Sequence, residues 1–366
     1  MRRRTTPARL RHLAVAALTI GATALVGTLA AAPAEAAGPK HPRVLPIAAT
    51  SDWLVYRQQT GNAYDVSFPK GSRLWYVGEH GARHALRDFD PERAQTLHGS
   101  LLVQADSWAT TADPTAPEHL HWRDLASGRS GDSTLPAGED LVGAAPGGWI
   151  SRRTDGSALQ LVRHTTDGRS SSFGAPLNGA GPTGVTIGPK GVVAAAGNTA
   201  AGNFDEQRNG SGRVRYATFR EPGTWRTVLA AGAGIDTSCG TPSATHVVCW
   251  VESHAAKHNG SVLVALNGTH ATWVGDHRSV CPVISFTAVG STAVGKASNT
   301  QSHCIRGRLT QLSAAGRVKT PKRGWGSHSS YITAGLSGIL LDTSDQRRIV
   351  RLSSVDGKAR TVVTAR

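Results

Sequence analysis

The chain of 366 residues lacks helical periodicity once its first 40 residues are passed. No window of about ten residues carries apolar side chains at the three-and-four spacing of an amphipathic helix. Glycine occurs 42 times and interrupts every stretch in which a helix could begin. These absences exclude a helical bundle and leave short strands and turns as the elements of the fold.

The sequence is also poor in catalytic and metal-binding motifs. It has no Gly-x-Ser-x-Gly elbow, no His-Glu-x-x-His pair and no phosphate-binding loop. His119 and His121 share one strand face, but a third metal ligand is not evident. Asp88, Asp90 and Glu92 have the oxygen ligands that calcium prefers, but the glycine of an EF-hand is absent, which favours a capped acidic loop. We therefore predict no catalytic residue, no metal and no cofactor.

Only one apolar run approaches membrane length, and it lies at the start of the chain. The basic start Arg2-Arg3-Arg4 precedes the apolar residues 13–29, and Ala34-Glu35-Ala36 offers a small-residue cleavage site. We predict a signal peptide over residues 1–36, with a retained membrane anchor as the alternative. After a short linker over residues 37–42, the remaining chain is expected to be secreted or extracellular, or associated with the cell wall, without a membrane span.

Cysteine is scarce. The four cysteines are an even number, which an oxidising compartment favours. Cys239 and Cys249 flank an expected strand turn, at a spacing that lets a hairpin bring two side chains together. Cys281 and Cys304 then remain as the second disulfide pair. Four free buried thiols are the alternative.

The sequence is rich in one repeated hairpin signal. A glycine stands between two strand-like runs at Gly81, Gly128, Gly168, Gly223, Gly268, Gly316 and Gly357. The mean spacing is about 46 residues, which is typical of propeller blades. A second glycine precedes an apolar run, and there we expect the turn between the first two strands of a blade: Gly99, Gly148, Gly191, Gly290 and Gly338. The sequence therefore predicts an all-β fold, a single seven-bladed β-propeller of four-stranded antiparallel blades over residues 43–366.

Gly188-Pro189-Lys190-Gly191 is close to the Ser-Pro-Asp-Gly turn that marks the blades of secreted WD40-like and TolB-type propellers. The repeats resemble those families in their period and in the placement of their turns. The resemblance implies a binding scaffold more than a particular chemistry. Residues 361–364 are expected to finish blade seven, which leaves closure of the ring to side-chain packing, with the N-terminal segment of residues 39–43 as a further contributor.

In a propeller, the links from second to third strand and from blade to blade lie on one face. Here these links are the long ones, and long loops on a rigid scaffold are where binding residues collect. The polar residues that we expect on this face are Tyr64, Asp65, Arg152, Arg153, Asp155, Asp205, Glu206, Arg208, Glu252, His254, His258, His277, Arg278, Trp325 and His328.

The formal net charge of the chain is +15, and a basic protein outside the cell is drawn to polyanions. The charges are spread over many blades, so ordinary solubilising charge explains the excess equally well. We predict a monomeric, non-catalytic binding module whose partner is a protein or a cell-wall polyanion, with no specific nucleic acid. One alternative is an enzyme on the same scaffold that acts on extracellular glycans or lactones. Another is a structural spacer without a ligand.

Overall fold

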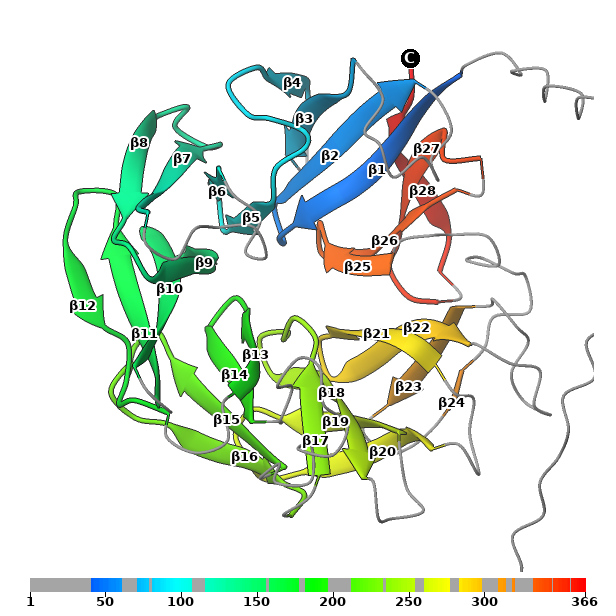
Figure 1. Cartoon of the computed structure of the whole chain (residues 1–366). Helices are drawn as coiled ribbons and strands as arrows, with labels where there is room; N and C mark the ends of the chain where they lie inside the picture. Colours follow the sequence, from blue (N-terminus) through cyan, green and yellow to red (C-terminus); the bar gives the residue numbers. More distant parts are fainter. Residues whose placement is uncertain are drawn as a thin grey trace, which may run out of the picture. The chain divides into compact units, whose positions relative to one another are not determined.

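The computed structural model describes residues 41–60, 71–78, 81–106, 116–155, 158–177, 182–196, 212–232, 235–253, 260–276, 283–297, 309–313, 318–319, 332–343, 345–355 and 357–366. All of them belong to one compact unit, Lys40–Arg366. These residues form strands, turns and bends and no helix, and the strands pair into seven four-stranded antiparallel sheets. The sheets follow one another around a ring, which confirms the predicted seven-bladed β-propeller (Figure 1).

Each blade is built from four consecutive strands that pair in chain order. Blades one to four comprise β1 (Pro42–Ala49), β2 (Trp53–Thr60), β3 (Arg73–Gly78) and β4 (Arg83–Leu86); β5 (Gln95–His98), β6 (Leu101–Ala105), β7 (Glu118–Asp124) and β8 (Ser130–Leu135); β9 (Glu139–Ala145), β10 (Gly148–Asp155), β11 (Ala158–Thr165) and β12 (Ser170–Ser172); β13 (Pro182–Ile187), β14 (Gly191–Ala196), β15 (Arg213–Thr218) and β16 (Arg226–Ala230). Blades five to seven comprise β17 (Ile235–Cys239), β18 (His246–Ser253), β19 (Gly260–Ala265) and β20 (Ala271–Asp276); β21 (Val283–Val289), β22 (Thr292–Ala297), β23 (Leu309–Ser313) and β24 (Val318–Lys319); β25 (Ile332–Gly335), β26 (Gly338–Asp342), β27 (Arg348–Leu352) and β28 (Ala359–Thr364).

The hydrophobic core lies between the blades. Second and third strands carry buried residues on both faces, as in β6, where every residue of LLVQA is buried. Both faces are covered because each sheet packs between two neighbouring blades. In one cluster, Val193 and Tyr216 of blade four pack with Val247 and Val262 of blade five. A blade without its neighbours would leave this apolar surface in water, so the blades stabilise one another.

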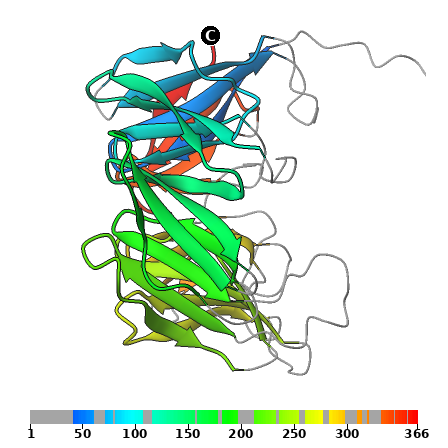
Figure 2. The same ribbon diagram turned by 60° about the vertical axis from the view of Figure 1, so that its left-hand side comes forward.

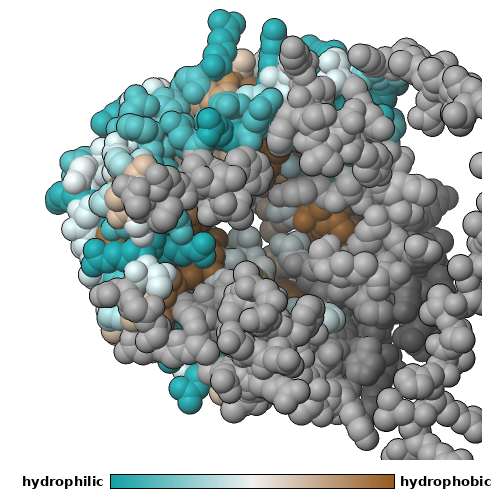
Figure 3. Space-filling model, in the orientation of Figure 1, coloured by the Kyte–Doolittle hydropathy of each residue, from teal (hydrophilic) through white to brown (hydrophobic). Residues whose placement is uncertain are grey.

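The segments that join the strands lie on two opposite faces of the ring. The turns from first to second strand and from third to fourth strand lie on one side, which we call the turn face. The links from second to third strand and from blade to blade lie on the other side, which we call the connection face. A turn can be short, as from Ala145 to Gly148, whereas the link from β14 to β15 runs from Ala196 to Arg213. Figure 2 brings blade three (green) to the front, and Figure 3 shows the ring hollowed at its centre.

The ring closes without an exchange of strands, because β1–β4 form blade one and β25–β28 form blade seven. As the sequence predicted, β28 completes blade seven and ends at Thr364. Two backbone hydrogen bonds cross the seam between these blades. The Val44 amide donates to the Gln346 carbonyl at 2.7 Å, and the Leu336 amide donates to the Thr50 carbonyl at 2.6 Å.

Backbone strain gathers at this seam. Leu336, Ser337 and Gln346 have φ angles of 47°, 56° and 55°, and no other non-glycine residue of the described ranges has a positive φ. A residue with a side chain loses about 1 to 2 kcal/mol in this left-handed region. Leu336 is nevertheless 2% exposed and packs with Leu54 and Tyr56 of blade one. The contacts across the seam therefore hold the strained turn in place.

The predicted disulfide between Cys239 and Cys249 is present. The two cysteines stand directly opposite each other in the register of β17 and β18, and Cys249 is fully buried. Cys281 and Cys304, the second predicted pair, lie outside the described residues. In the part of the chain that the structure describes, there is no helix able to traverse a bilayer.

Candidate functional site

The connection face holds those residues predicted for binding that the structure describes. Arg152 and Arg153 lie near the end of β10, and Asp155 is the last residue of that strand. Glu252 lies near the end of β18. The other predicted residues are outside the described ranges: Tyr64, Asp65, Asp205, Glu206, Arg208, His254, His258, His277, Arg278, Trp325 and His328. The described polar contacts on this face centre on blade three and on the link between blades one and two.

Arg152 and Arg153 lie on opposite faces of blade three, as successive strand residues must. Each stands opposite a carboxylate in the register of β9 and β10. Arg152 Nε is 3.4 Å from Asp140 Oδ2, and both side chains are partly exposed. Arg153 Nη1 is 4.0 Å from Glu139 Oε1. The Arg153 side chain is 54% exposed, whereas the Glu139 side chain is 5% exposed. The sequence prediction included the two arginines and missed both carboxylates, which only the strand register brings beside them.

Glu139 also belongs to a buried polar network within blade three. The Ser151 hydroxyl donates to Glu139 Oε2 at 2.5 Å. His164 Nε2 lies 3.0 Å from the same carboxylate oxygen and 2.8 Å from Ser151 Oγ. The other ring nitrogen of His164, Nδ1, is 2.9 Å from Ser170 Oγ. Trp149 stacks on the imidazole, with ring centroids 6.0 Å apart, and packs into the cluster between blades two and three.

Serine, histidine and glutamate together suggest nucleophilic catalysis, but the geometry of this network does not fit it. In a catalytic triad the carboxylate binds Nδ1 of the histidine and leaves Nε2 for the serine. Here Glu139 and Ser151 share Nε2 of His164. Ser151 is fully buried, so a substrate has no access to its hydroxyl. The network instead satisfies polar groups that the packing of blade two on blade three removes from water.

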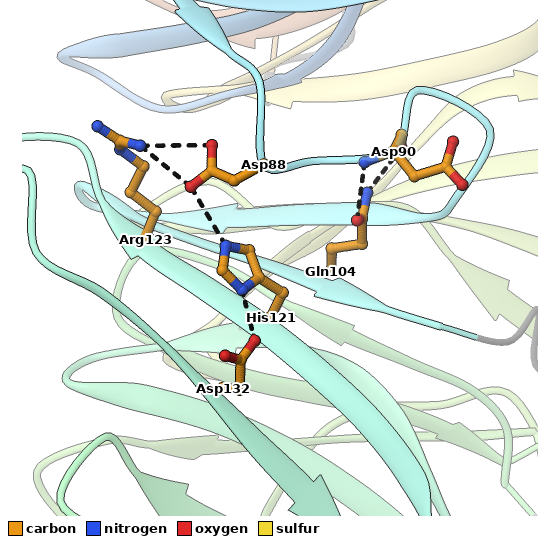
Figure 4. A network of polar contacts seen from close by, with 6 residues as sticks. All are labelled: Asp88, Asp90, Gln104, His121, Arg123 and Asp132. Carbon is orange, nitrogen blue, oxygen red and sulfur yellow. Dashed lines mark hydrogen bonds and ion pairs between the residues drawn. The ribbon is translucent and has the colours of Figure 1, made fainter.

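A second network clamps the link between blades one and two onto blade two (Figure 4). Arg123 Nη1 donates to the two carboxylate oxygens of Asp88 at 3.3 and 3.1 Å. Asp88 Oδ2 also lies 3.3 Å from His121 Nε2, and His121 Nδ1 lies 2.7 Å from Asp132 Oδ1. Phe89 packs edge-on against the same imidazole, with ring centroids 4.7 Å apart. His121 is therefore held between two carboxylates and fixes the link to the third strand of blade two.

The charge state of Asp88 follows from these contacts. Burial alone would raise the pKa of its carboxyl group. Hydrogen bonds from its own backbone amide and from His121, together with the charge of Arg123, outweigh burial and hold the pKa below the ordinary carboxyl value. Asp88 therefore remains ionised well into the acidic range.

The acidic segment that follows is a capped loop. The Gln104 side chain accepts a hydrogen bond from the Asp90 amide at 3.0 Å and donates one to the Asp90 carbonyl at 2.7 Å. Asp90 Oδ1 accepts a hydrogen bond from the Glu92 amide at 2.8 Å. In the described ranges, no group of three or more histidine, cysteine, aspartate or glutamate side chains is arranged to hold a metal ion.

No protein-family model and no curated protein sequence matches the chain. Several solved structures do resemble it. A prolyl endopeptidase matches with a TM-score of 0.61 at 13% identity, over 88% of this chain and 48% of that one. The β-propeller domain of the Trilobed protease from Pyrococcus furiosus, which has an open velcro topology, matches with a TM-score of 0.56 at 9% identity, over 89% and 97%. The acylaminoacyl peptidase from Pyrococcus horikoshii matches with a TM-score of 0.55 at 9% identity, over 89% and 52%.

These likenesses show the propeller fold alone, because the identities are low. The chain spans about half the length of the prolyl endopeptidase and of the acylaminoacyl peptidase. It covers nearly the whole of the propeller domain from Pyrococcus furiosus. The architectural resemblance to propeller repeat proteins is thereby confirmed, and the function has to be argued from the chain's own residues.

Proposed function

We propose that this protein is an exported, non-catalytic binding module whose connection face binds a partner outside the cell. The observation that supports the proposal is that the long links between strands lie on the connection face only. In blade one, β2 ends at Thr60 and β3 begins at Arg73, and in blade four the corresponding bounds are Ala196 and Arg213. Long links on a rigid ring are suited to binding, because the sheets position them while their sequence is free to vary. The disulfide in blade five supports export to an oxidising compartment.

The partner that we propose is a cell-wall polyanion. Without the predicted signal peptide, residues 1–36, which hold five arginines and one glutamate, the formal net charge is about +11, and such a charge raises the local concentration of a polyanion. Arg153 offers an exposed guanidinium on the connection face, although Glu139 lies 4.0 Å away. An acidic protein surface is the alternative partner, because the same positive charge attracts it.

The chemistry of the described residues favours binding over catalysis. The serine and histidine of blade three are buried and hydrogen-bonded to Glu139. His121 has both ring nitrogens beside carboxylates. Neither network presents an accessible nucleophile beside a free general base, which an enzyme for glycans or lactones would require.

A binding assay with purified cell-wall polyanion in a salt series tests the proposal. Arg152→Gln combined with Arg153→Gln removes two positive charges from the connection face. Arg129→Gln combined with Arg220→Gln removes the same two charges from exposed turns of the turn face and serves as the matched control. We expect the first double variant to bind at least about tenfold more weakly than the control, and all affinities to fall steeply as salt rises.

Three outcomes would contradict this proposal. Equal losses in both double variants would mean that net charge alone attracts the polymer. Binding of the polymer that salt leaves unchanged would favour a specific pocket over charge attraction. Release of glycan fragments, or hydrolysis of a lactone, would support an enzyme.

A further inference from the structure

A cleft of about 510 Å³ lies at the connection-face end of blade one. The start of β3, the end of β4 and the link to blade two form its walls. The residues that line it include Arg73, Trp75, Leu86, Arg87, Phe89 and Pro91. A cleft of this size is within the range of sites for small molecules.

The link lies between this cleft and blade two, and Phe89 touches both, since it lines the cleft and packs against His121 of blade two. Arg87, Phe89 and Pro91 line the cleft, whereas the intervening Asp88 and Asp90 are hydrogen-bonded to blade two (Figure 4). The network of Figure 4 therefore holds one wall of the cleft in position. A wall that is fixed before binding reduces the conformational entropy that the protein loses when a ligand associates.

The cleft carries positive charge that no described residue neutralises. Arg73 and Arg87 are exposed, and their side chains form no ion pair or hydrogen bond with another described residue. The carboxylate next to them in the link, Asp88, is already bonded to Arg123 and His121. An anionic group that enters the cleft would meet two guanidinium groups that no described carboxylate pairs with, and guanidinium groups bind carboxylates in a well-defined, bidentate geometry.

The remaining walls are apolar. Leu86 and Phe89 line the cleft but are only 2% and 4% exposed, because their side chains pack in the cluster between blades one and two, whereas Trp75 packs against the cluster between blades one and seven. Trp75 and Pro91 are half-buried and leave apolar surface accessible. An indole and a proline ring suit a flat apolar group, because such surfaces stack with large contact area and little loss of entropy.

We infer that this cleft binds a small organic acid, in which a carboxylate is attached to a flat apolar body. The carboxylate pairs with Arg73 and Arg87, and the apolar body lies against Trp75 and Pro91. The inference goes beyond the proposed function, since a small acid can occupy this cleft whether or not a polymer binds the connection face.

Isothermal titration calorimetry on the full chain tests the inference, with naphthalene-2-carboxylate as the probe and its neutral amide, naphthalene-2-carboxamide, as the matched compound. We expect the carboxylate to bind with a Kd below about 1 mM and the amide at least about tenfold more weakly. Arg73→Gln combined with Arg87→Gln should weaken the carboxylate at least about tenfold and leave the amide unchanged. The control double variant, Arg129→Gln with Arg220→Gln, should bind both compounds as the wild type does.

Several results would overturn the inference. One is that the acid and the amide bind with equal affinity, and another is that no binding of the acid is detected up to about 10 mM. A third is that both double variants weaken binding of the acid equally. Circular dichroism of each variant confirms that the substitutions, all at exposed arginines, leave the fold intact.

Discussion

Replacing Leu336 by glycine and by alanine measures the strain at the seam between blades one and seven. Leu336 has a φ of 47° and is 2% exposed, and it packs with residues of both blades. Both variants lose a buried side chain beyond Cβ, which lowers the free energy of unfolding by about 2 to 5 kcal/mol. The two variants differ in their backbones, and that difference reports the strain.

Two effects set the difference. Glycine adopts the left-handed region without a steric penalty, whereas alanine loses about 1 to 2 kcal/mol there. Glycine also gives the unfolded chain more freedom, which lowers stability by about 1 kcal/mol relative to alanine. We therefore expect Leu336→Gly to equal Leu336→Ala in stability, or to exceed it by up to about 1 kcal/mol.

Leu340 supplies the control, because it is fully buried in the same cluster and its φ is not in the left-handed region. There glycine relieves no strain, so Leu340→Gly should be at least about 1 kcal/mol less stable than Leu340→Ala. Urea unfolding followed by tryptophan fluorescence gives all four free energies. If glycine is worse than alanine by the same margin at both positions, the seam turn is not strained and this account of closure is wrong.

The remaining predictions concern titratable groups and the disulfide. Burial lowers the pKa of the His98 imidazole below 6.5. The contribution of His98 to stability is therefore complete above about pH 6.5 and is lost as the pH falls through the lower pKa of the folded state. The Tm of His98→Gln should fall less than that of the wild type between about pH 6.5 and 5, and parallel Tm profiles would contradict this. Because the pKa of Asp88 is lowered, its stabilisation is present above about pH 4 and is lost as the pH falls through the lower pKa of the folded state. Asp88→Asn should lower the free energy of unfolding by about 0.5 to 1 kcal/mol at pH 7 and by less at pH 2, and an equal deficit at both pH values would exclude the ionic contribution. Replacing both Cys239 and Cys249 by alanine should lower the free energy of unfolding by about 2 to 3 kcal/mol in denaturant titrations, and an unchanged midpoint would show that the bridge does not stabilise the fold.

The blade repeat was predictable because its signals are local. Gly128, Gly168 and Gly268 stand in the turns from third to fourth strand, with φ angles of 75°, 87° and 77° that favour glycine. The bridge between Cys239 and Cys249 was predictable for the same reason, since one hairpin brings both residues together. Features that a single hairpin determines can be derived from a short stretch of sequence.

At Gly148 and Gly338, glycine is required by contact with another strand of the blade. The sequence predicted them as turn residues, but they are the first residues of β10 and β26. A Cβ atom on either would overlap a backbone carbonyl oxygen of the third strand, that of His164 or of Leu352. Glycine is therefore required at both positions because the third strand approaches closely, and not because the turn needs a particular backbone conformation.

The polar networks were beyond sequence reasoning. Ser151 and His164 each look like ordinary strand residues, and only the register of β10 and β11 and the packing against blade two bring them into contact. Asp88 lies in the link between blades one and two, 35 residues before Arg123 in blade two. Side-chain pairs of this kind depend on how blades pack, which no repeat period encodes.

Hydrogen–deuterium exchange with and without the cell-wall polyanion tests the binding face most directly. We predict that the polymer slows exchange on the connection face, including residues 135–140 and the end of β10 around Arg152 and Arg153. The turns at residues 165–169 and 266–270, on the turn face, should exchange at the same rate in both states. Protection of those turns, with none at the end of β10, would contradict the account.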